Sequence, residues 1–274
     1  MYLTIIKDNE SIDHRDYGFE CLSFRKSSLS PTNKYETVEG RHGLISTGTV
    51  WGGRLLTAEF LIQSIDHIDL ELTIDEITEI FSTEGEKELS LIDSRQPGKV
   101  WYAKVDKEFT PDRINFRTGR FTVDFISAVP FCRSLGNTLE DPIDFDSDKW
   151  QAIAGGLDLS EDMNYSFITN KFKVCNGGVY LDPRQLPLVI TFKGASENLQ
   201  IKNLTTGDVF TYKGTTAAGD TIELNGVRHL KNGVSIFADT NHKRISLKSG
   251  WNEFEIIGAT STFTITLSFN FWYK

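Results

Sequence analysis

The chain has 274 residues, of which 39% are hydrophobic and 24% are charged, so it can bury the core of one large or two ordinary domains. Its formal net charge of -9 argues against a general affinity for nucleic acid and against adhesion to an anionic membrane surface. The composition, with 19 Phe residues and many Val, Ile and Thr residues, favours strands over helices.

The N-terminal sequence and the cysteines indicate the compartment in which the chain folds. The first residues carry no basic region followed by a long apolar run, so we expect no secretory signal. No stretch approaches the roughly 18 apolar residues of a membrane helix. Three scattered cysteines, Cys21, Cys132 and Cys175, do not make a disulfide framework and are expected to be buried free thiols. We therefore expect a soluble protein made in a reducing cytoplasm.

Alternating apolar and polar residues predict three strands in the first half of the chain. The segment 55–63 is the most apolar of them, and 101–107 has the pattern of a half-buried strand. The segment 121–125 places three apolar residues on one face, with Thr and Asp on the other. These strands are expected to form a sheet.

One helix is expected between the first two of these strands. Thr73 and Glu76 have the spacing of a capping box, in which each side chain accepts from the other's backbone amide. The apolar face that follows at helical spacing consists of Ile74, Ile77, Ile80 and Phe81. Gly85 is a plausible stop signal. We predict a helix over about 74–83 that packs on the sheet.

The periodicity then lapses over about 20 residues, and the segment 137–148 is acidic, contains a Pro and has no repeat. We interpret 137–160 as a linker. It divides the chain into a domain at 1–136 and a second domain at 161–274.

The second half contains about eight short strands separated by turn signals such as Asn232-Gly233 and Ser249-Gly250. The predicted strands are 188–193, 199–203, 209–213, 221–225, 234–239, 244–247, 252–257 and 262–273. In the last strand, every second residue from Phe263 to Phe271 is apolar. This spacing is typical of a β-sandwich.

No residues have the spacing of a metal site. The five histidines are His14, His42, His67, His229 and His242. None forms a zinc-binding pair, and we interpret them as surface or loop residues. The segment from Asp144 to Asp148 imitates the start of a calcium loop, but Lys149 and Gly155 stand where Gly and Glu are needed. A solvated acidic segment is the better interpretation.

Catalytic motifs are equally weak. No nucleophile elbow, phosphate loop or dinucleotide-binding motif occurs, and the glycines of 40–43 and 52–53 are typical of turns. Glu253 and Glu255 share one strand face and could serve glycoside hydrolysis, but a polar outer face explains them as well. We assign no catalytic, cofactor-binding or metal-binding residues, expect no cofactor, and predict that the chain is not an enzyme.

Six aromatic residues offer a different possibility, since aromatic rings can stack on sugar rings. They are Trp150, Tyr165, Tyr212, Trp251, Trp272 and Tyr273. Packing in the core or at subunit contacts is the favoured interpretation, because most aromatic area in a sandwich is buried.

Six segments in a fixed order carry a resemblance to a known family. In the first half they are Val38-Glu-Gly-Arg-His-Gly-Leu-Ile45 and Trp51-Gly-Gly-Arg-Leu-Leu56, a glycine-bearing turn and then a strand with an early Arg. In the second half they are 201–207, 220–225, 234–239 and 247–252, the last of which contains a Gly-x-Asn turn. Over most of its length the chain resembles the distal tail proteins of long-tailed phages, the siphophages.

The resemblance implies a mainly β fold. The N-terminal domain would be a tail-tube-like β-sandwich or split barrel flanked by the helix at 74–83. The C-terminal domain would be a galectin-like β-sandwich, similar to carbohydrate-binding modules. The protein would be a structural component of the virion, located in the phage tail tip and synthesised in the host cytoplasm.

The resemblance also implies partners. The N-terminal domains would form a homo-hexameric ring, a baseplate hub that joins the major tail tube protein to the tail-associated tip protein and lies beside the tape measure protein. The C-terminal domains would anchor receptor-binding proteins or side fibres for host adsorption. DNA would pass through the lumen without specific nucleic-acid binding, which suits an acidic chain, and no membrane insertion is expected.

Two other hypotheses stand beside the tail hub. The first is a free-standing carbohydrate-binding or adhesin module that recognises a saccharide of the host cell wall. The second is a glycoside hydrolase that uses Glu253 and Glu255.

Overall fold

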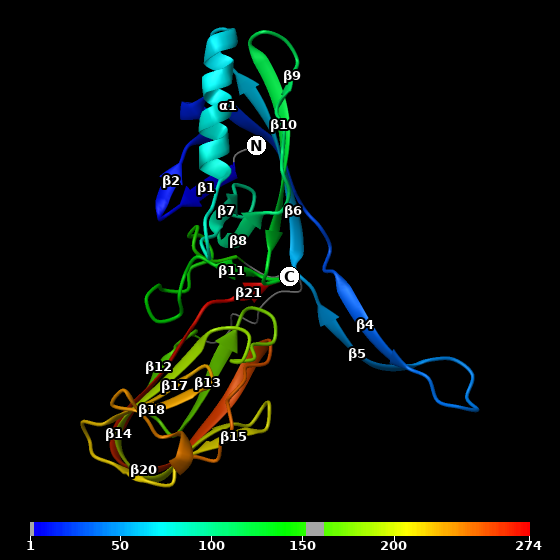
Figure 1. Ribbon diagram of the computed structural model, residues 1–274. Helices are drawn as coiled ribbons and strands as arrows, with labels where there is room; N and C mark the ends of the chain where they lie inside the picture. The colour runs from blue at the N-terminus through cyan, green and yellow to red at the C-terminus, as the bar shows by residue number, and fades with distance from the viewer. Residues whose placement is uncertain (1–2, 152–161) are drawn as a thin grey trace. The chain divides into compact units, whose positions relative to one another are not determined.

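The computed structural model describes residues 3–151 and 162–274 (Figure 1). The chain divides into two compact units, Met1–Cys132 with Lys274, and Arg133–Tyr273. Strands dominate both units, and the one α-helix among the described residues is α1 (His67–Phe81). The prediction of a mainly β fold with one helix in the first half is confirmed.

The first unit is built on antiparallel strands in the order β2-β1-β7-β8-β10-β6-β3. Their bounds are β1 (Leu3–Lys7), β2 (Glu10–Ile12), β3 (Phe19–Lys26), β6 (Arg54–Gln63), β7 (Leu89–Asp93), β8 (Lys99–Val105) and β10 (Thr118–Ser127), with β9 (Asp112–Arg113) beside β10. Strands β6 and β10 pair along their whole length, whereas β8 meets β10 at only two residue pairs. The three predicted strands correspond to β6, β8 and β10.

Phenylalanines fill the space between this sheet and α1. Phe60 of β6 and Phe121 of β10 are cross-strand partners whose rings stack with centroids 4.9 Å apart. Phe19 meets Phe60 edge-on at 5.5 Å, and Phe81 at the end of α1 lies 5.5 Å from Phe60. All four side chains are almost completely buried. The two-residue period of β6 and β10 therefore produces one apolar face, on which the helix packs.

The helix begins earlier than predicted. Asp66 is its N-cap, and the carboxylate of Asp66 accepts from the backbone amides of Ile68 and Asp69 at 2.8 and 3.0 Å. Asp69 in turn accepts from the Ile65 amide at 2.8 Å. The predicted start at Thr73 is wrong, because this residue lies buried in the helix interior. The apolar face itself is confirmed for Ile77, Ile80 and Phe81, and Leu70 extends it by almost two turns.

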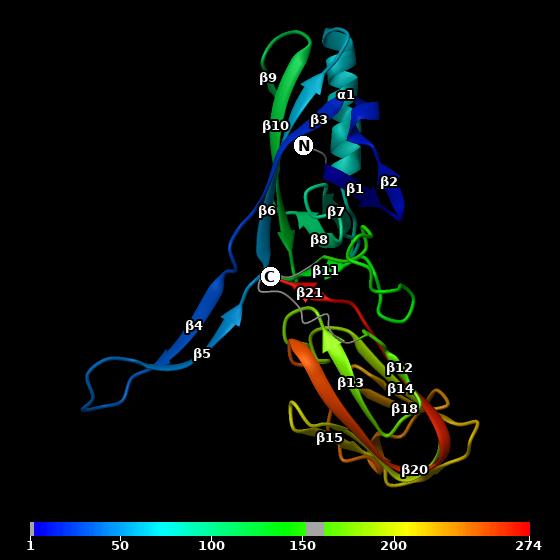
Figure 2. The same cartoon turned by 180° about the vertical axis from the view of Figure 1, so that it is seen from behind.

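A two-stranded hairpin, β4 (Pro31–Glu36) and β5 (Ile45–Trp51), extends away from the sheet of the first unit (Figures 1 and 2). The loop at its tip is the glycine-bearing segment 37–44, where Gly40 and Gly43 have φ values of +78° and +87°. Left-handed backbone of this kind favours glycine. Nearly every side chain of the hairpin is exposed, so neither strand has an apolar face against a core.

The second unit is arranged around two long strands, β14 (Leu188–Asn203) and β20 (Gly250–Phe269). The strand order is β12-β20-β14-β17-β18-β19, with β13 also beside β20 and β15 and β16 also beside β14. The remaining bounds are β12 (Ser166–Phe167), β13 (Lys171–Asn176), β15 (Asp208–Thr211), β16 (Thr215–Thr216), β17 (Thr221–Asn225), β18 (Arg228–Lys231), β19 (Val234–Ser235) and β21 (Trp272–Tyr273). The two halves of each long strand pair with different neighbours, as expected for a β-sandwich.

The bends in the long strands explain why the sequence suggested four strands in place of two. The pairing of β14 with β20 shifts register after Gly194 and again after Ser196. Gly258 has a φ of +88°, and a Cβ atom there would lie 2.4 Å from the Glu197 carbonyl oxygen. Only glycine fits this close approach. The register shifts within 194–200 and the glycine at 258 therefore interrupt the pattern without interrupting the strands.

Two other strand predictions in this unit are corrected. The segment 234–239 forms only β19 and a short 3-10 helix, η2 (Phe237–Asp239). The segment 244–247 forms a single bridge, between Leu247 and Leu181. By contrast, the alternation at the C-terminus is confirmed, because every second side chain from Phe263 to Phe271 is buried.

The described part of the expected linker packs within the second unit. Thr138 is buried, and its hydroxyl donates to the Leu267 carbonyl at 3.0 Å. Trp150 is 2% exposed, and its ring lies 4.9 Å from that of Phe271. Residues 137–151 are thus part of this unit. The rest of the expected linker, 152–160, lies outside the described residues, as does Gly155 of the calcium-loop comparison.

Candidate assembly surfaces

The β4–β5 hairpin presents apolar side chains directly to solvent. We call residues 31–51 the arm. Its exposed large apolar residues are Tyr35, Val38, Leu44, Val50 and Trp51. Tyr35 and Val50 are each 53% exposed, and Leu44 is 61% exposed. A hairpin with two solvated faces is marginally stable by itself, and contiguous exposed apolar residues commonly mark an interaction site.

A second apolar surface lies where the start of α1 meets the turn between β9 and β10, side by side in both views (Figures 1 and 2). The Ser64 amide and hydroxyl both donate to the Arg117 carbonyl, at 2.9 and 3.0 Å, and hold the two segments together. We call this surface the apical patch. It consists of Ile65, Ile68, Leu72, Ile114 and Phe116, which are between 58% and 78% exposed. Its residues come from two segments that these hydrogen bonds hold side by side.

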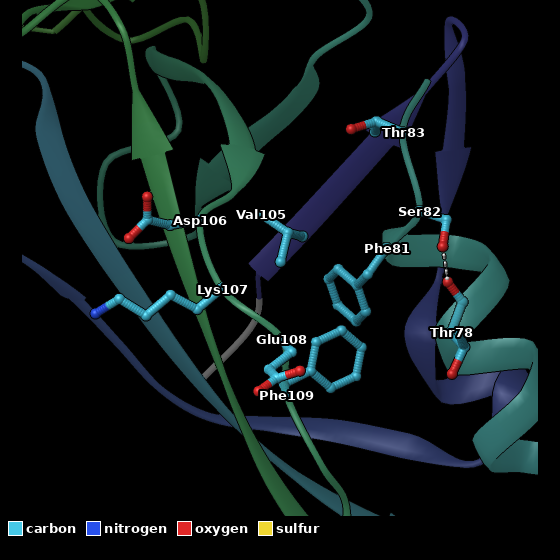
Figure 3. Close-up of a pocket in the computed structure, with 9 residues that line it drawn as sticks. All are labelled: Thr78, Phe81, Ser82, Thr83, Val105, Asp106, Lys107, Glu108 and Phe109. Atoms are coloured by element: carbon cyan, nitrogen blue, oxygen red, sulfur yellow. Dashed lines mark hydrogen bonds between the residues drawn. The ribbon is translucent and has the colours of Figure 1, made fainter. Parts of the chain in front are cut away.

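A cavity of about 510 Å³ opens at the other end of α1 (Figure 3). The rings of Phe81 and Phe109 form its apolar wall, 5.7 Å apart and edge to face, with Val105 beside them. The charged residues Asp106, Lys107 and Glu108 follow along the connection after β8. The lining contains no His or Cys, and it presents no nucleophile paired with a base. This cavity can accept an apolar side chain, but it has no catalytic geometry.

The histidine interpretation is partly wrong. His14 is fully buried, and its Nδ1 lies 2.8 Å from the Phe19 carbonyl oxygen. His229 is also buried, with its Nδ1 3.1 Å from the Thr240 hydroxyl, and burial lowers the pKa of its imidazole. His42, His67 and His242 are exposed as expected. No three His, Cys, Asp or Glu side chains converge as a metal site in the described part of the chain.

The carboxylates singled out from the sequence have structural partners. Glu253 and Glu255 lie on β20 opposite Lys173 and Lys171 of β13, and Lys171 is 3.4 Å from Glu255. Such cross-strand ion pairs are typical of a polar sheet face. The Asp144 side chain accepts from the Asp146 amide at 2.9 Å and closes an exposed turn.

Five of the six aromatic residues considered for sugar stacking are buried, and Trp251 is intermediate. The Tyr165 hydroxyl donates to the Cys175 carbonyl at 2.8 Å inside the core. The packing interpretation therefore holds for the five buried residues. The three cysteines are free and buried, as predicted, and burial raises the pKa values of Cys21 and Cys132 to about 11.

The segments that carried the family resemblance lie in turns and in the strands beside them. Segment 38–45 forms most of the arm's tip, and Arg54 of segment 51–56 begins β6, with its guanidinium 5.0 Å from the Trp101 ring. In the second unit, Asn203 and Asn252 come from two different segments, and their side chains are 3.2 Å apart. Asn252 closes the Gly-x-Asn turn through hydrogen bonds to the Lys248 amide and carbonyl, both 2.8 Å.

The arm and the apical patch were not predicted from the sequence. An exposed hairpin has no apolar period, so its strands give no alternation to detect. The one available signal was the set of apolar residues that stand among Gly, Thr and Ser in 44–51. No helix in residues 3–151 and 162–274 has both the length and the apolar character of a membrane span.

Comparison with known proteins follows the division into two units. Residues 12–127 match the family model of the phage tail protein RIFT-related domain. No curated protein matches the sequence significantly. Among solved structures, the Dit protein of phage SPP1, described as a hub of the adsorption apparatus in phages that infect Gram-positive bacteria, matches with a TM-score of 0.69 at 15% identity. The match covers 99% of this chain and 100% of that one.

Two structures of the phage P2 baseplate in its activated conformation also match. The structure with Ca has a TM-score of 0.41 at 10% identity and covers 97% of this chain and 98% of that one. The structure with Sr has a TM-score of 0.43 at 10% identity, with 97% of both chains covered. These scores are too low to support an argument. The domain match and the SPP1 Dit fold confirm the resemblance to distal tail proteins.

Proposed function

We propose that this chain, with a phage tail domain at 12–127 and the fold of a distal tail protein, is a structural subunit of a long-tailed phage virion. In this proposal six copies form a ring through their first units and make the hub at the tail tip. The ring joins the tail tube to the tail-associated tip protein and lies beside the tape measure protein. The second units anchor receptor-binding proteins or side fibres.

The observation that carries the proposal is the pair of apolar surfaces on the first unit. The arm and the apical patch are different surfaces with different residues, and both are exposed in the single chain. A ring has head-to-tail interfaces, in which one surface of each copy meets another surface of the next. Two distinct exposed apolar surfaces on one unit are what such an interface requires, whereas a two-fold dimer needs one self-complementary surface.

The arm also supplies unpaired strand edges. β4 and β5 pair only with each other, so each has a free edge among the described residues. Edges of this kind are protected in assemblies by pairing with another chain or by burial against it. In the proposed ring, the arm of one copy lies on the next copy and covers both its apolar residues and its edges.

The net charge is compatible with a conduit for DNA. The chain carries a formal charge of -9, and a lumen lined by carboxylates repels the phosphate backbone and lets DNA pass without retention. In this proposal the ring contributes geometry and an inert channel and performs no chemistry. The protein is therefore a virion component without enzymatic activity.

The proposal is tested by measuring the mass of the purified full-length chain by light scattering over a concentration series. Negative-stain images show the shape of the assembled species. The proposal predicts a sixfold mass and ring-shaped particles. A double variant of the arm, Val50→Ser with Trp51→Ser, should shift the chain to monomers, because it removes exposed apolar area that the ring buries.

A matched control is Ile168→Ser, which removes a 75% exposed apolar residue from the second unit. It should leave the sixfold mass unchanged. A chain that stays monomeric at every concentration contradicts self-assembly of the ring. An equal loss of assembly in the control contradicts the assignment of the interface to the first unit.

A further inference from the structure

We infer that the second unit contains a binding site for a sugar that carries an acidic group, a carboxylate or a phosphate. The site is a polar hollow of about 270 Å³, which shares no residue with the arm or the apical patch. Its lining comes from three segments, the loop 180–184, the start of β15 and the loop 242–246. The lining residues used below are Tyr180, Asp208, Lys243 and Arg244.

The loops around the hollow are held in place by hydrogen bonds. Leu181 and Leu247 exchange two backbone hydrogen bonds of 2.8 and 3.0 Å, which tie the first loop to the third. The Asn241 side chain accepts from the Thr211 amide at 3.1 Å and donates to the Val209 carbonyl at 2.8 Å. Asn203 donates to the Ser246 carbonyl at 2.7 Å. The hollow is therefore preformed, which lowers the entropic cost of binding.

Positive charge exceeds negative charge in the hollow, whose lining contains Arg184, Lys243 and Arg244 but only two carboxylates, those of Asp182 and Asp208. Arg184, at the rim, is paired with Asp182 through hydrogen bonds of 2.9 and 3.0 Å. Lys243 and the half-buried Arg244 make no side-chain hydrogen bond or ion pair among the described residues. A guanidinium matches a carboxylate or phosphate with two parallel hydrogen bonds. In a chain with a net charge of -9, a hollow with more cations than carboxylates favours an anionic ligand.

The carboxylate of Asp208 is oriented and partly available. Its Oδ2 accepts from the Ser246 amide at 2.9 Å, from the Ser246 hydroxyl, and from the Thr206 hydroxyl at 2.8 Å. Its Oδ1 accepts no hydrogen bond within the part of the chain that the structure describes. A fixed carboxylate in the same lining as two cations repels a bare anion, but its free oxygen can accept a hydrogen bond from a hydroxyl group. This combination favours a ligand that carries both an acidic group and hydroxyls.

Tyr180 adds an aromatic ring to the lining of the hollow. Its ring lines the hollow and is 53% exposed. An exposed aromatic face is a platform for the apolar face of a sugar ring. His242, in loop 242–246, also lines the hollow. Its backbone is left-handed, with a φ of +58°, and its ring lies 4.3 Å from that of Phe237. Left-handed backbone at a residue other than glycine costs energy and is frequent at binding sites.

The inference is tested by measuring the binding of glucuronate and of glucose 6-phosphate to the full-length chain. Calorimetry and saturation-transfer NMR give the affinities, and glucose and inorganic phosphate are the comparison probes. Both acidic sugars should bind more tightly than either comparison probe, and the tighter of the two identifies the acidic group. Arg244→Gln should weaken both by about tenfold, as expected when a charge-assisted hydrogen bond is lost. Tyr180→Ala should weaken both sugars and leave inorganic phosphate unchanged.

Arg228→Gln is the control, because Arg228 is an exposed cation of the same unit outside the hollow. It should leave every affinity unchanged. Absence of binding by both acidic sugars overturns the inference. So does an equal effect of Arg228→Gln, which would indicate diffuse charge, or equal affinity for inorganic phosphate, which would indicate an anion site without sugar recognition.

Discussion

Lys26 and Asp93 lie 67 residues apart in the sequence, yet the Lys26 ammonium donates to the buried Asp93 carboxylate over 3.0 Å. Lys26 is the last residue of β3, which is the final strand in the strand order of the first unit. Asp93 is the last residue of β7, and three strands separate β7 from β3 in that order. Arg95 joins the same two strands, since its guanidinium donates to Asp93 and to the Phe24 carbonyl, both at 2.8 Å. The sheet of the first unit therefore folds back on itself around its Phe core.

Asp93→Asn should destabilise the first unit by about 2 kcal/mol, because charged hydrogen bonds from Lys26 and Arg95 lose their ionic partner. The loss of unfolding free energy is measured by urea unfolding, with circular dichroism as the readout. Asp8→Asn is the matched control, since Asp8 forms an exposed pair with Lys87 at 2.9 Å and such pairs contribute little. Equal losses in the two variants would contradict the role given to Asp93.

The same carboxylate makes stability depend on pH. Burial raises the pKa of Asp93, but hydrogen bonds from Arg95 and Lys26 outweigh it and bring the pKa to about 2, from 3.8. Because the pKa is lower in the folded chain, this contribution is complete above the unfolded value and is lost as the pH falls from 3.8 towards 2. The difference in unfolding free energy between wild type and Asp93→Asn should shrink across this window. A constant difference would contradict the shift.

Asp66→Ala should destabilise the chain by about 1 kcal/mol, because the first amides of α1 lose their acceptor. Glu76→Ala tests the alternative start predicted from the sequence and should have almost no effect, since the Glu76 side chain is exposed in mid-helix. Thermal unfolding of both variants decides between the two starts. A larger loss for Glu76→Ala than for Asp66→Ala would support the capping box at Thr73.

Gly136→Ala should destabilise the second unit by roughly 1–3 kcal/mol, since an added methyl group would lie 2.6 Å from the Trp150 ring. Trp150 also donates to the Pro142 carbonyl at 2.9 Å, so it cannot move freely. Tryptophan fluorescence during urea unfolding reports both the packing and the stability. Gly219→Ala is the control, because a Cβ atom there meets nothing within 4 Å. An unchanged midpoint for Gly136→Ala would show that Trp150 is loosely packed.

Several elements could be predicted from the sequence because their own residues determine them. Strands β6, β10 and the second half of β20 each have one face against a core, and this burial imposes the two-residue alternation that the sequence displays. The apolar face of α1 follows the helical period for the same reason. Burial of the free cysteines followed from their chemistry, since an isolated thiol behaves as a small apolar group.

Other features depend on residues that are distant in the sequence, and only the tertiary structure decided them. His14 and His229 are buried against rings from other strands, those of Phe60 and Phe210 respectively. The long strands β14 and β20 remain continuous through their bends because each supplies the other with partners. The arm has no core face to give it a period, and the polar hollow of the second unit brings together three loops. Local sequence records the burial of a side chain, but it does not record which distant chain segment buries it.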